Sequence, residues 1–376
     1  MSKVLPGTIK RFLLLALVTA LLVCRGPLPS TATSTMPALG SLSAQTIAAQ
    51  ADQYLSNLAT EAGFSGSVLM ARHGEILLSS GYGEADRERH ILNTAQTRFR
   101  LSSLTKQFTA MAILILQERG ALNVQDRICI HLADCPARWQ AITIHQLLTH
   151  TAGIPDFNRL PGFWATIELP SSPAETIARF RDKPLEFLPG EKFRYSNSGY
   201  ILLGAIIEQA SGSTYETFLQ DSIFAPLQMA DSGYDHNAGD LAVGYRDRST
   251  QADFIDMSIP FAAGGVYSTV ADLYRWDRAL YTEQLISQAL LDKMFTPFVP
   301  ILDGGGFGPG YGWFIGKEGD RPIASHAGAI NGFSSMITRY RHDHTFITVL
   351  SNREDTNLAE IQMQLTNILF KFDSSM

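Results

Sequence analysis

The spacing of hydrophobic and polar positions changes twice along the chain. Residues 44–62 (AQTIAAQADQYLSNLATEA) place apolar side chains at helical intervals and stop at Gly63, which predicts a helix. Residues 65–72 and 75–82 (SGSVLMAR and EILLSSGY) are short apolar-rich runs joined by a His-Gly pair, which predicts an antiparallel hairpin. From Ser102 to about residue 290 the pattern is typical of helices broken by Pro- and Gly-rich loops.

Strand-like runs return from Tyr311 onward, and residues 357–372 (NLAEIQMQLTNILFKF) predict a closing amphipathic helix. The returning runs are YGWFIGKEG, PIASHAG, GFSSMITRYR and TFITVLSNR. Because strands come first and last with helices between them, we expect both chain ends to share one sheet. The prediction is an α+β fold, in which an antiparallel sheet is flanked by N- and C-terminal helices and carries a mostly helical inserted lobe. One lobe would comprise residues 45–100 and 300–372, and the helical lobe about 101–299.

Composition and charge narrow the class of protein. The chain has 376 residues, 45% of them hydrophobic and 18% charged, which excludes collagen, a coiled coil and wholesale disorder. This length fits either two domains or one large core. The net charge is −6, with 30 basic against 36 acidic residues and no long basic run. Such a chain offers no extended track for phosphates, so no nucleic-acid partner is expected.

The N-terminus has the order of charge, apolar run and small residues that is typical of an export signal. Three basic residues within positions 1–11 precede the apolar run of residues 12–24. That run has 13 residues, short of the roughly 20 that a membrane-spanning helix needs. We expect a signal peptide at residues 1–32, with an uncertain boundary, a Ser/Thr/Ala-rich linker at 33–44, and a periplasmic or secreted protein. An uncleaved anchor that tethers the protein to a membrane, a lipoprotein attached at Cys24 and a buried N-terminal helix are the alternatives.

Two cysteines remain as an even pair if the signal is removed. Outside the cytoplasm, Cys129 and Cys135 can form a disulfide, which would close only the short loop RICIHLADCP. Two free, half-buried thiols are the alternative. A metal site is disfavoured, because His131 is the one nearby imidazole and three ligands do not complete a tetrahedron.

A serine and a lysine open the most apolar helical run of the chain. Ser103 and Lys106 lie one helical turn apart, and the run that follows is apolar nearly all round between residues 108 and 116 before it ends at Gly120. A buried helix of this kind would present an alcohol and an amine to a cleft, where desolvation lowers the pKa of the amine and makes it a general base. The alternative is ordinary: Ser102 caps the helix and Lys106 is a solvated cation.

Two further motifs carry chemistry. Tyr195 and Asn197 lie two residues apart before another apolar helix, so the phenol could carry a proton while the amide donates to a substrate carbonyl. A helix-entry loop capped by Asn197 or Ser198 is the alternative. Near the C-terminus, PIASHAGAING puts His326 on a strand, followed by small residues at 327–329 that allow a ligand to approach the backbone. His326 is a candidate catalytic residue; the alternative, more common for a single histidine, is a satisfied, partly buried side chain.

Together, S-x-x-K, Y-x-N and H-x-G, in this order, resemble the penicillin-binding protein and class C β-lactamase superfamily of serine hydrolases. The segments FRLSSLTKQFTAMAI, LLTHTAGIPDF, FRYSNSGYILLGAII and AAGGVYSTVADLYRW also look like family segments. The resemblance covers about residues 45–372. It implies a β-lactamase/transpeptidase-like fold.

The resemblance also implies roles for individual residues. Ser103 would be the acylated nucleophile, with Lys106 and Tyr195 sharing the proton transfers. Asn197 would hold the amide or ester side of the substrate. The backbone N–H groups of Ser103 and Ala329 would form the oxyanion hole.

The H-x-G triplet departs from the family pattern at two positions. His326 stands where the β-lactamases proper have a lysine, and a histidine that is neutral at pH 7 attracts a substrate carboxylate less strongly. Ala327 lacks the hydroxyl of the family's threonine, while Gly328, a substrate-binding position by resemblance, is kept. No E-x-x-L-N segment is present, so deacylation would run through Tyr195 or be slow. These departures favour esterase or peptidase chemistry.

Rival motifs are weaker. No G-x-S-x-G occurs, so the nucleophile motif of the α/β-hydrolases is absent. His342-Asp-His344 fits a polar hairpin turn better than a metal site. The Gly-rich residues 304–312 fit a mobile loop at the rim of the cleft.

The overall prediction is an exported serine hydrolase (carboxypeptidase, esterase or β-lactamase) that forms an acyl-enzyme, without metal or cofactor. Its substrate would be a small peptide of D-Ala type or a carboxylic ester, with β-lactam hydrolysis weak or absent. A penicillin-binding sensor or a non-catalytic binding protein on the same fold is the alternative.

Overall fold

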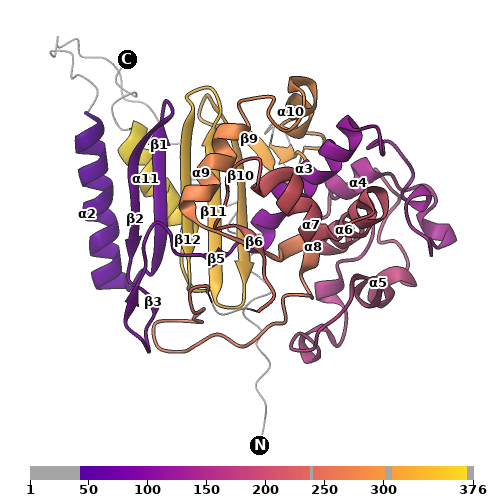
Figure 1. Cartoon of the computed structure of the whole chain (residues 1–376), viewed down its shortest axis with the longest axis horizontal. Coiled ribbons are helices and arrows are strands. Elements are labelled where there is room, and N and C mark those ends of the chain that lie inside the picture. The colour runs from indigo at the N-terminus through magenta and orange to yellow at the C-terminus, as the bar shows by residue number, and fades with distance from the viewer. Residues whose placement is uncertain (1–42, 238–239, 301–306, 371–376) are drawn as a thin grey trace, which may run out of the picture.

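The computed structural model describes residues 43–237, 240–300 and 307–370. The expected signal peptide (1–32) and nearly all of the expected linker (33–44) lie outside these residues. The two helices at the ends of the described chain lie beside one sheet, and the inserted helices gather at its other side (Figure 1). None of the described helices is long and apolar enough to cross a membrane.

A seven-stranded antiparallel sheet joins the two ends of the chain. Its spatial order is β2-β1-β12-β11-β10-β9-β8, so the N-terminal hairpin pairs directly with the last strand, with Gly66 opposite Ser351. The strands are β1 (Gly66–Arg72), β2 (Glu75–Tyr82), β8 (Gly308–Pro309), β9 (Phe314–Glu318), β10 (Arg321–Ile330), β11 (Phe333–Tyr340) and β12 (Thr345–Ser351). This topology confirms the expected fold class.

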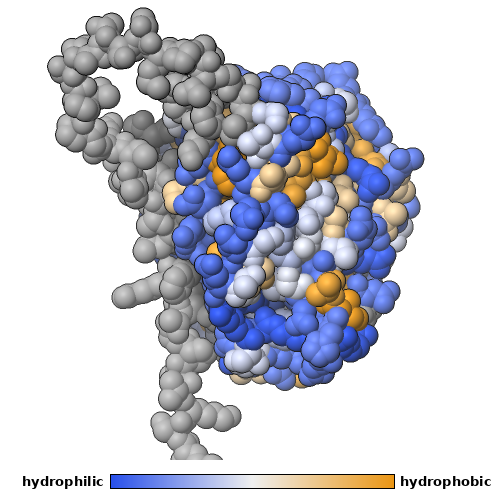
Figure 2. All heavy atoms as spheres, turned by 90° about the vertical axis from the view of Figure 1, so that its left-hand side faces the viewer, coloured by the Kyte–Doolittle hydropathy of each residue, from blue (hydrophilic) through white to orange (hydrophobic). Residues whose placement is uncertain are grey.

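The terminal helices α2 (Ala44–Ala62) and α11 (Leu358–Phe370) form one hydrophobic core with the sheet. Leu55 of α2 and Leu365 of α11 are fully buried there with Val68 of β1, and burying each such side chain contributes about 1.5–3 kcal/mol. Helix α2 begins with the Ser43 side chain accepting from a backbone N–H and ends at a left-handed glycine, as its pattern predicts. Figure 2 shows the face that carries α2, where hydrophobic residues form separate patches on a mostly hydrophilic surface.

The inserted lobe is helical, with short strands that the sequence pattern did not predict. Its helices are α3 (Thr105–Glu118), α4 (Ile144–Leu148), α5 (Pro173–Arg181), α6 (Asn197–Ser211), α7 (Tyr215–Leu219), α8 (Phe261–Gly264), α9 (Val270–Ala279) and α10 (Gln288–Met294). Single turns are η1 (Ser102–Leu104), η2 (Ile128–Ile130), η3 (Ala137–Trp139), η4 (Phe157–Arg159), η5 (Phe163–Ala165) and η6 (Gln220–Phe224). The short strands within this lobe are β6 (Gly233–Tyr234) and β7 (Val266–Ser268), and the short strands β3 (Glu84–Asp86), β4 (Ile91–Leu92) and β5 (Phe99–Arg100) precede the lobe. Strands of two or three residues are too short to show an alternating pattern.

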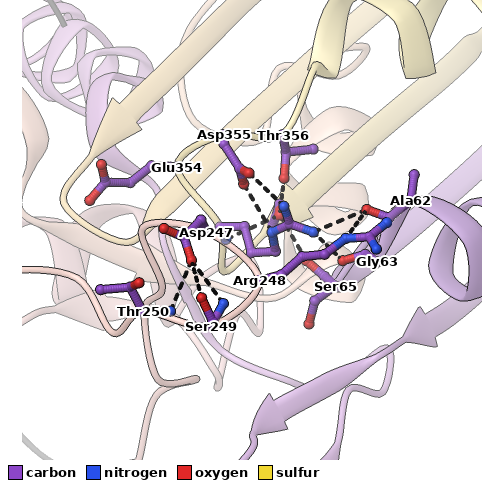
Figure 3. A network of polar contacts seen from close by, with 12 residues as sticks. Ala62, Gly63, Ser65, Asp247, Arg248, Ser249, Thr250, Glu354, Asp355 and Thr356 are labelled. Atoms are coloured by element: carbon purple, nitrogen blue, oxygen red, sulfur yellow. Dashed lines mark hydrogen bonds and ion pairs between the residues drawn. The ribbon is translucent and has the colours of Figure 1, made fainter. Parts of the chain in front are cut away.

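Two arginines cap the C-terminal end of α2. Figure 3 shows one of them, Arg248, beside Ala62 and Gly63. Arg248 Nε donates to the carbonyl oxygen of Ala62 at 3.0 Å, and Arg353 donates to the carbonyls of Ala62 and Gly63 while its other nitrogens pair with Asp355. Cations at a helix C-terminus satisfy unpaired carbonyls and oppose the helix dipole. The contacts tie α2 to the segment after β12, through Arg353, and to the segment that carries Arg248.

Two local expectations can be compared directly with the structure. Cys129 and Cys135 form a disulfide, with their Cα atoms 5.2 Å apart. The expected mobile Gly-rich loop is wrong for its described part, because residues 307–312 are buried and Gly308–Pro309 pairs with β9. At Gly312, where φ is +74°, a Cβ would lie 2.6 Å from the carbonyl oxygen of Lys106. This segment packs against the backbone that carries the candidate site.

Candidate active site

Ser103 lies in the single turn η1, directly before the buried helix α3. Every residue from Thr105 to Leu116 is buried, which holds this turn rigidly at the face of the sheet. Ser102 does not cap the helix: its φ is +52°, an uncommon value for a residue with a side chain, and its hydroxyl has no partner among the described residues. Ser103 itself keeps 8% of its surface exposed, so its hydroxyl lies at the edge of the core.

Strand β10 rests on this turn at Gly328. A Cβ at position 328 would lie 2.5 Å from the carbonyl oxygen of Leu101 and 3.0 Å from the Cβ of Ser102. Ser335 of β11 donates to the same Leu101 oxygen at 2.8 Å. The glycine therefore allows two protein backbones to meet, whereas the sequence had suggested room for a ligand. The next residue, Ala329, is exposed beside the turn.

Lys106 points its amine at three oxygen atoms. Its Nζ lies 3.2 Å from Ser103 Oγ, 2.9 Å from Asn197 Oδ1 and 2.7 Å from the carbonyl oxygen of Ala263 at the end of α8. The side chain is fully buried, and its Nζ faces the rings of Tyr195 and Tyr200 at 5.0 and 5.4 Å from their centroids. The solvated cation of the alternative interpretation is therefore wrong.

The surroundings of Lys106 favour a neutral amine. Burial lowers its pKa to about 7, with a smaller opposing effect from the carboxylate of Asp156. A neutral amine has two hydrogens and one lone pair. Asn197 and Ala263 offer acceptor oxygens for both hydrogens, so the lone pair is left for the hydroxyl proton of Ser103. This geometry suits a general base beside an alcohol.

Asn197 begins α6 and is held by a carboxylate. Its backbone N–H and its side-chain Nδ2 both donate to Asp156 Oδ1, at 3.1 and 3.3 Å. Neither Asn197 nor Ser198 caps α6 with its own side chain, since the capping position is Ser196, whose side chain makes no cap bond. The second hydrogen of Nδ2 makes no hydrogen bond with a described residue.

Tyr195 lies over Lys106 and stacks on a buried histidine. The rings of Tyr195 and His150 are 4.3 Å apart at 26°, and His150 Nδ1 accepts from the backbone N–H of Ser196. The Tyr195 hydroxyl is buried without a hydrogen-bond partner in the described chain. Burial raises its pKa, an effect that the nearby Ser103 hydroxyl opposes, so Tyr195 is a neutral phenol at pH 7.

His326 shares the cleft but contacts its own strand. Its Nδ1 lies 2.7 Å from the carbonyl oxygen of Ala327, and its ring is 6.3 Å from that of Tyr195. Burial, and then the charge of Lys106, lower the pKa of His326 to about 3, so the imidazole is neutral at pH 7. It makes no hydrogen bond to Ser103, Lys106 or Tyr195 among the contacts of the described residues.

The structure therefore brings Ser103, Lys106, Tyr195 and Asn197 together and places the H-x-G triplet beside them. Sequence reasoning missed two residues of this cluster, His150 and Asp156. Both lie in the segment LLTHTAGIPDF, which resembles a family segment but in which the sequence analysis assigned no role to any residue. No group of three or more His, Cys, Asp or Glu suited to a metal occurs within the described ranges.

Comparisons with known proteins identify the family and the fold. A model of the Beta-lactamase family matches residues 51–365. A penicillin-binding protein of Bacillus subtilis (strain 168) is 32% identical over 333 residues, covering 82% of this chain and 72% of the relative.

Solved structures share the fold. The octameric penicillin-binding protein homologue from Pyrococcus abyssi superposes with a TM-score of 0.77 at 29% identity, covering 86% of this chain and 77% of that one. A D-stereospecific amidohydrolase from a Streptomyces species gives a TM-score of 0.72 at 25% identity, covering 87% and 98%. These matches describe what the chain is similar to.

Proposed function

The chain belongs to the Beta-lactamase family, and from this premise we propose that it is a serine hydrolase that forms an acyl-enzyme at Ser103. The observation that carries the proposal is the environment of Lys106 Nζ, which meets Ser103 Oγ and two carbonyl oxygens in a buried site. A base with a pKa of about 7 is matched to proton transfer near neutral pH.

The reaction would follow from these positions. The Lys106 amine takes the proton of Ser103 while Oγ forms a bond to the substrate carbonyl carbon. The backbone N–H groups of Ser103 and Ala329 are the proposed donors to the oxyanion. When the bond to the leaving nitrogen or oxygen breaks, the proton passes to that atom from Lys106, with the Tyr195 phenol as relay. Water then attacks the ester by the same route in reverse and releases the acid.

The substrate class we propose is an amide or ester, with D-amino-acid derivatives as the first candidates. His326 is neutral and Ala327 has no hydroxyl, so the triplet 326–328 itself offers neither charge nor hydroxyl to a substrate carboxylate. The similarity to a D-stereospecific amidohydrolase supports amide chemistry. β-Lactams, which carry a carboxylate, would be poor substrates. The N-terminal charge, apolar and small-residue order supports export, which we propose as the location of this activity.

A second candidate function is binding with slow or no turnover. The phenol of Tyr195 has no partner among the described residues, and without a well-placed relay the acyl-enzyme would persist. The protein would then act as an acylated sensor of the penicillin-binding type.

One panel tests both functions. Wild type and Ser103→Ala would be assayed with p-nitrophenyl acetate, a D-amino-acid amide, a D-Ala-D-Ala peptide and a chromogenic cephalosporin. We expect steady turnover of the ester and the amide by wild type and none by the variant. A stoichiometric burst without turnover would favour the sensor, and equal rates for both proteins would contradict the role of Ser103.

A further inference from the structure

Asp156 is a buried carboxylate that the proposed reaction does not use. It is 8% exposed and precedes the single turn η4. Its Oδ1 accepts both hydrogen bonds from Asn197, and its Oδ2 lies 3.7 Å from Nε of the half-exposed Arg159. All of these partners are donors, which is the pattern of an ionised carboxylate. A buried charge is costly, so its retention calls for a purpose.

The backbone around Asp156 is clamped to the first turn of α6. The Ser198 hydroxyl donates to the carbonyl oxygen of Pro155 at 2.7 Å and accepts from the N–H of Phe157 at 2.9 Å. One side chain thus bonds to the residue before and the residue after Asp156. The backbone that carries the carboxylate cannot move away from Asn197 without breaking these bonds, so the position of this backbone is built into the fold.

The consequence for Asn197 is a fixed amide orientation. Nδ2 donates to a carboxylate, and Oδ1 accepts from Lys106 Nζ at 2.9 Å. A flipped amide would put an oxygen against a carboxylate and an NH₂ group against the amine. Asp156 thereby decides which end of Asn197 faces the catalytic lysine.

The consequence for Lys106 is electrostatic. The titratable groups that face its amine are Tyr195 and Tyr200 from α6 and its entry loop, His150 after α4, His326 on β10, and Asp156. Burial raises the pKa of both tyrosines and lowers that of both histidines, so these four are neutral at pH 7. Burial raises the pKa of the Asp156 carboxyl, an effect that the hydrogen bonds from Asn197 and the charges of Arg159 and Lys106 oppose. Because each of its partners is a donor, we assign Asp156 as the charged member of this group.

We infer that Asp156 is a positioning residue, whose carboxylate orients the Asn197 amide toward Lys106 and sets the pH at which the lysine becomes a base. The inference rests on the proposed function, in which Ser103 is the nucleophile. A purely structural interpretation also exists, since Asp156 accepts from the first N–H of α6 and acts as a cap supplied from outside the helix. The test must therefore separate charge from hydrogen bonding.

Two substitutions make that separation. Asp156→Asn keeps an oxygen that accepts both Asn197 bonds and removes the charge, whereas Asp156→Ala removes both. The matched control is Asp221→Asn, which removes one exposed carboxylate from the same lobe. The readout is the second-order rate at which a fluorophosphonate labels Ser103 between pH 5 and 9, together with kcat and KM for p-nitrophenyl acetate and the melting temperature.

We expect the acid limb of the Asp156→Asn profile to lie at least about 0.5 pH unit below that of wild type, because the loss of a negative charge makes the lysine lose its proton at lower pH. Its melting temperature should remain close to that of wild type. Asp156→Ala should lower kcat about 10-fold or more with a smaller change in KM, and Asp221→Asn should overlay wild type.

An unshifted limb in a folded Asp156→Asn protein would overturn the electrostatic part, and wild-type kcat in Asp156→Ala would overturn the orienting part. If Asp156→Ala does not fold, the pH profile of the isosteric Asp156→Asn variant still tests the inference. Ser103→Ala is included in the same experiment. Labelling of that variant at the wild-type rate means that the proposed function has failed, whereas its complete inertness together with unshifted Asp156 profiles means that the inference alone has failed.

Discussion

Among the described residues, two cationic side chains are completely buried, Lys106 in the cleft and Arg339 in β11, and their surroundings differ. Arg339 Nε lies 2.5 Å from the carboxylate of Asp277 on α9, and both side chains are 1% exposed. Lys106 meets three uncharged oxygens, and its nearest carboxylate, Asp156, is reached only through the amide of Asn197.

The difference follows from the chemistry of the two cations. A guanidinium keeps its charge in a protein, so burying one demands a direct counterion, and the rings of Tyr281, Phe295 and Trp313 complete the enclosure of Arg339. An amine can discard its charge by losing a proton. A buried cation with a carboxylate beside it therefore stabilises the fold, whereas a buried amine with only uncharged partners can act as a base.

The largest effect should come from removing the base. Lys106→Met should lower kcat/KM for p-nitrophenyl acetate by about 10³-fold, since no group remains to accept the Ser103 proton. Its stability should fall by no more than about 2 kcal/mol, because only two carbonyl oxygens lose a donor. Steady-state kinetics and urea unfolding check both parts, with the exposed Lys183→Met as control. If Lys106→Met keeps a tenth of the wild-type kcat/KM, Lys106 is not the base and the distinction between the two buried cations fails.

The opposite pattern, a loss of stability without a loss of activity, is expected for Arg339. Arg339→Met should cost about 3–5 kcal/mol of unfolding free energy, because Asp277 would be left buried without its counterion. The folded fraction should retain wild-type kcat. The double variant Arg339→Met/Asp277→Leu should recover most of the stability, as measured by urea unfolding. A single variant that is stable but inactive would reverse the assignment of the two cations.

The pH dependence sharpens the contrast. Only the neutral amine of Lys106 accepts a proton, so activity should fall as the pH drops through about 7 and level off above it. Burial raises the pKa of Tyr195, so loss of its proton should cause no decline below pH 10. The profile of kcat/KM for a neutral ester measures this. A rate that is constant from pH 5 to 9 would contradict a lysine base.

The smallest effect should come from the disulfide, which touches neither cation. Replacing Cys129 and Cys135 together by serine should reduce stability by about 2 kcal/mol, as expected for so short a loop. The rate of Ser103 labelling should not change. A large loss of activity in the folded variant would show that the helical lobe is less rigid than the packing around α3 indicates.

Much of the site could be read from the sequence because its chemistry is carried by side chains in short motifs. Ser103 and Lys106 are one helical turn apart, and an apolar helix behind them already implies burial of the amine. The strands near both ends of the chain were recognisable as short apolar-rich runs, and their order along the chain predicted that they pair in one sheet.

The remainder depends on tertiary contacts that no local pattern encodes. The third oxygen around Lys106 belongs to the backbone of Ala263, and any residue type would supply it. Asp156 acquires its importance from a helix that begins 41 residues later. Gly328 suggested space for a ligand, although its actual neighbour is the backbone before Ser103.

The location of the acyl group tests the central claim most directly. Wild type and Ser103→Ala would be mixed with p-nitrophenyl acetate, quenched in acid within the first turnover, digested and mapped by mass spectrometry. We predict one acetyl group on the peptide that contains Ser103 in wild type and none on that peptide in the variant. Turnover by wild type with the acetyl group on another residue, or with no covalent intermediate and undiminished activity of the variant, would contradict Ser103 as the nucleophile.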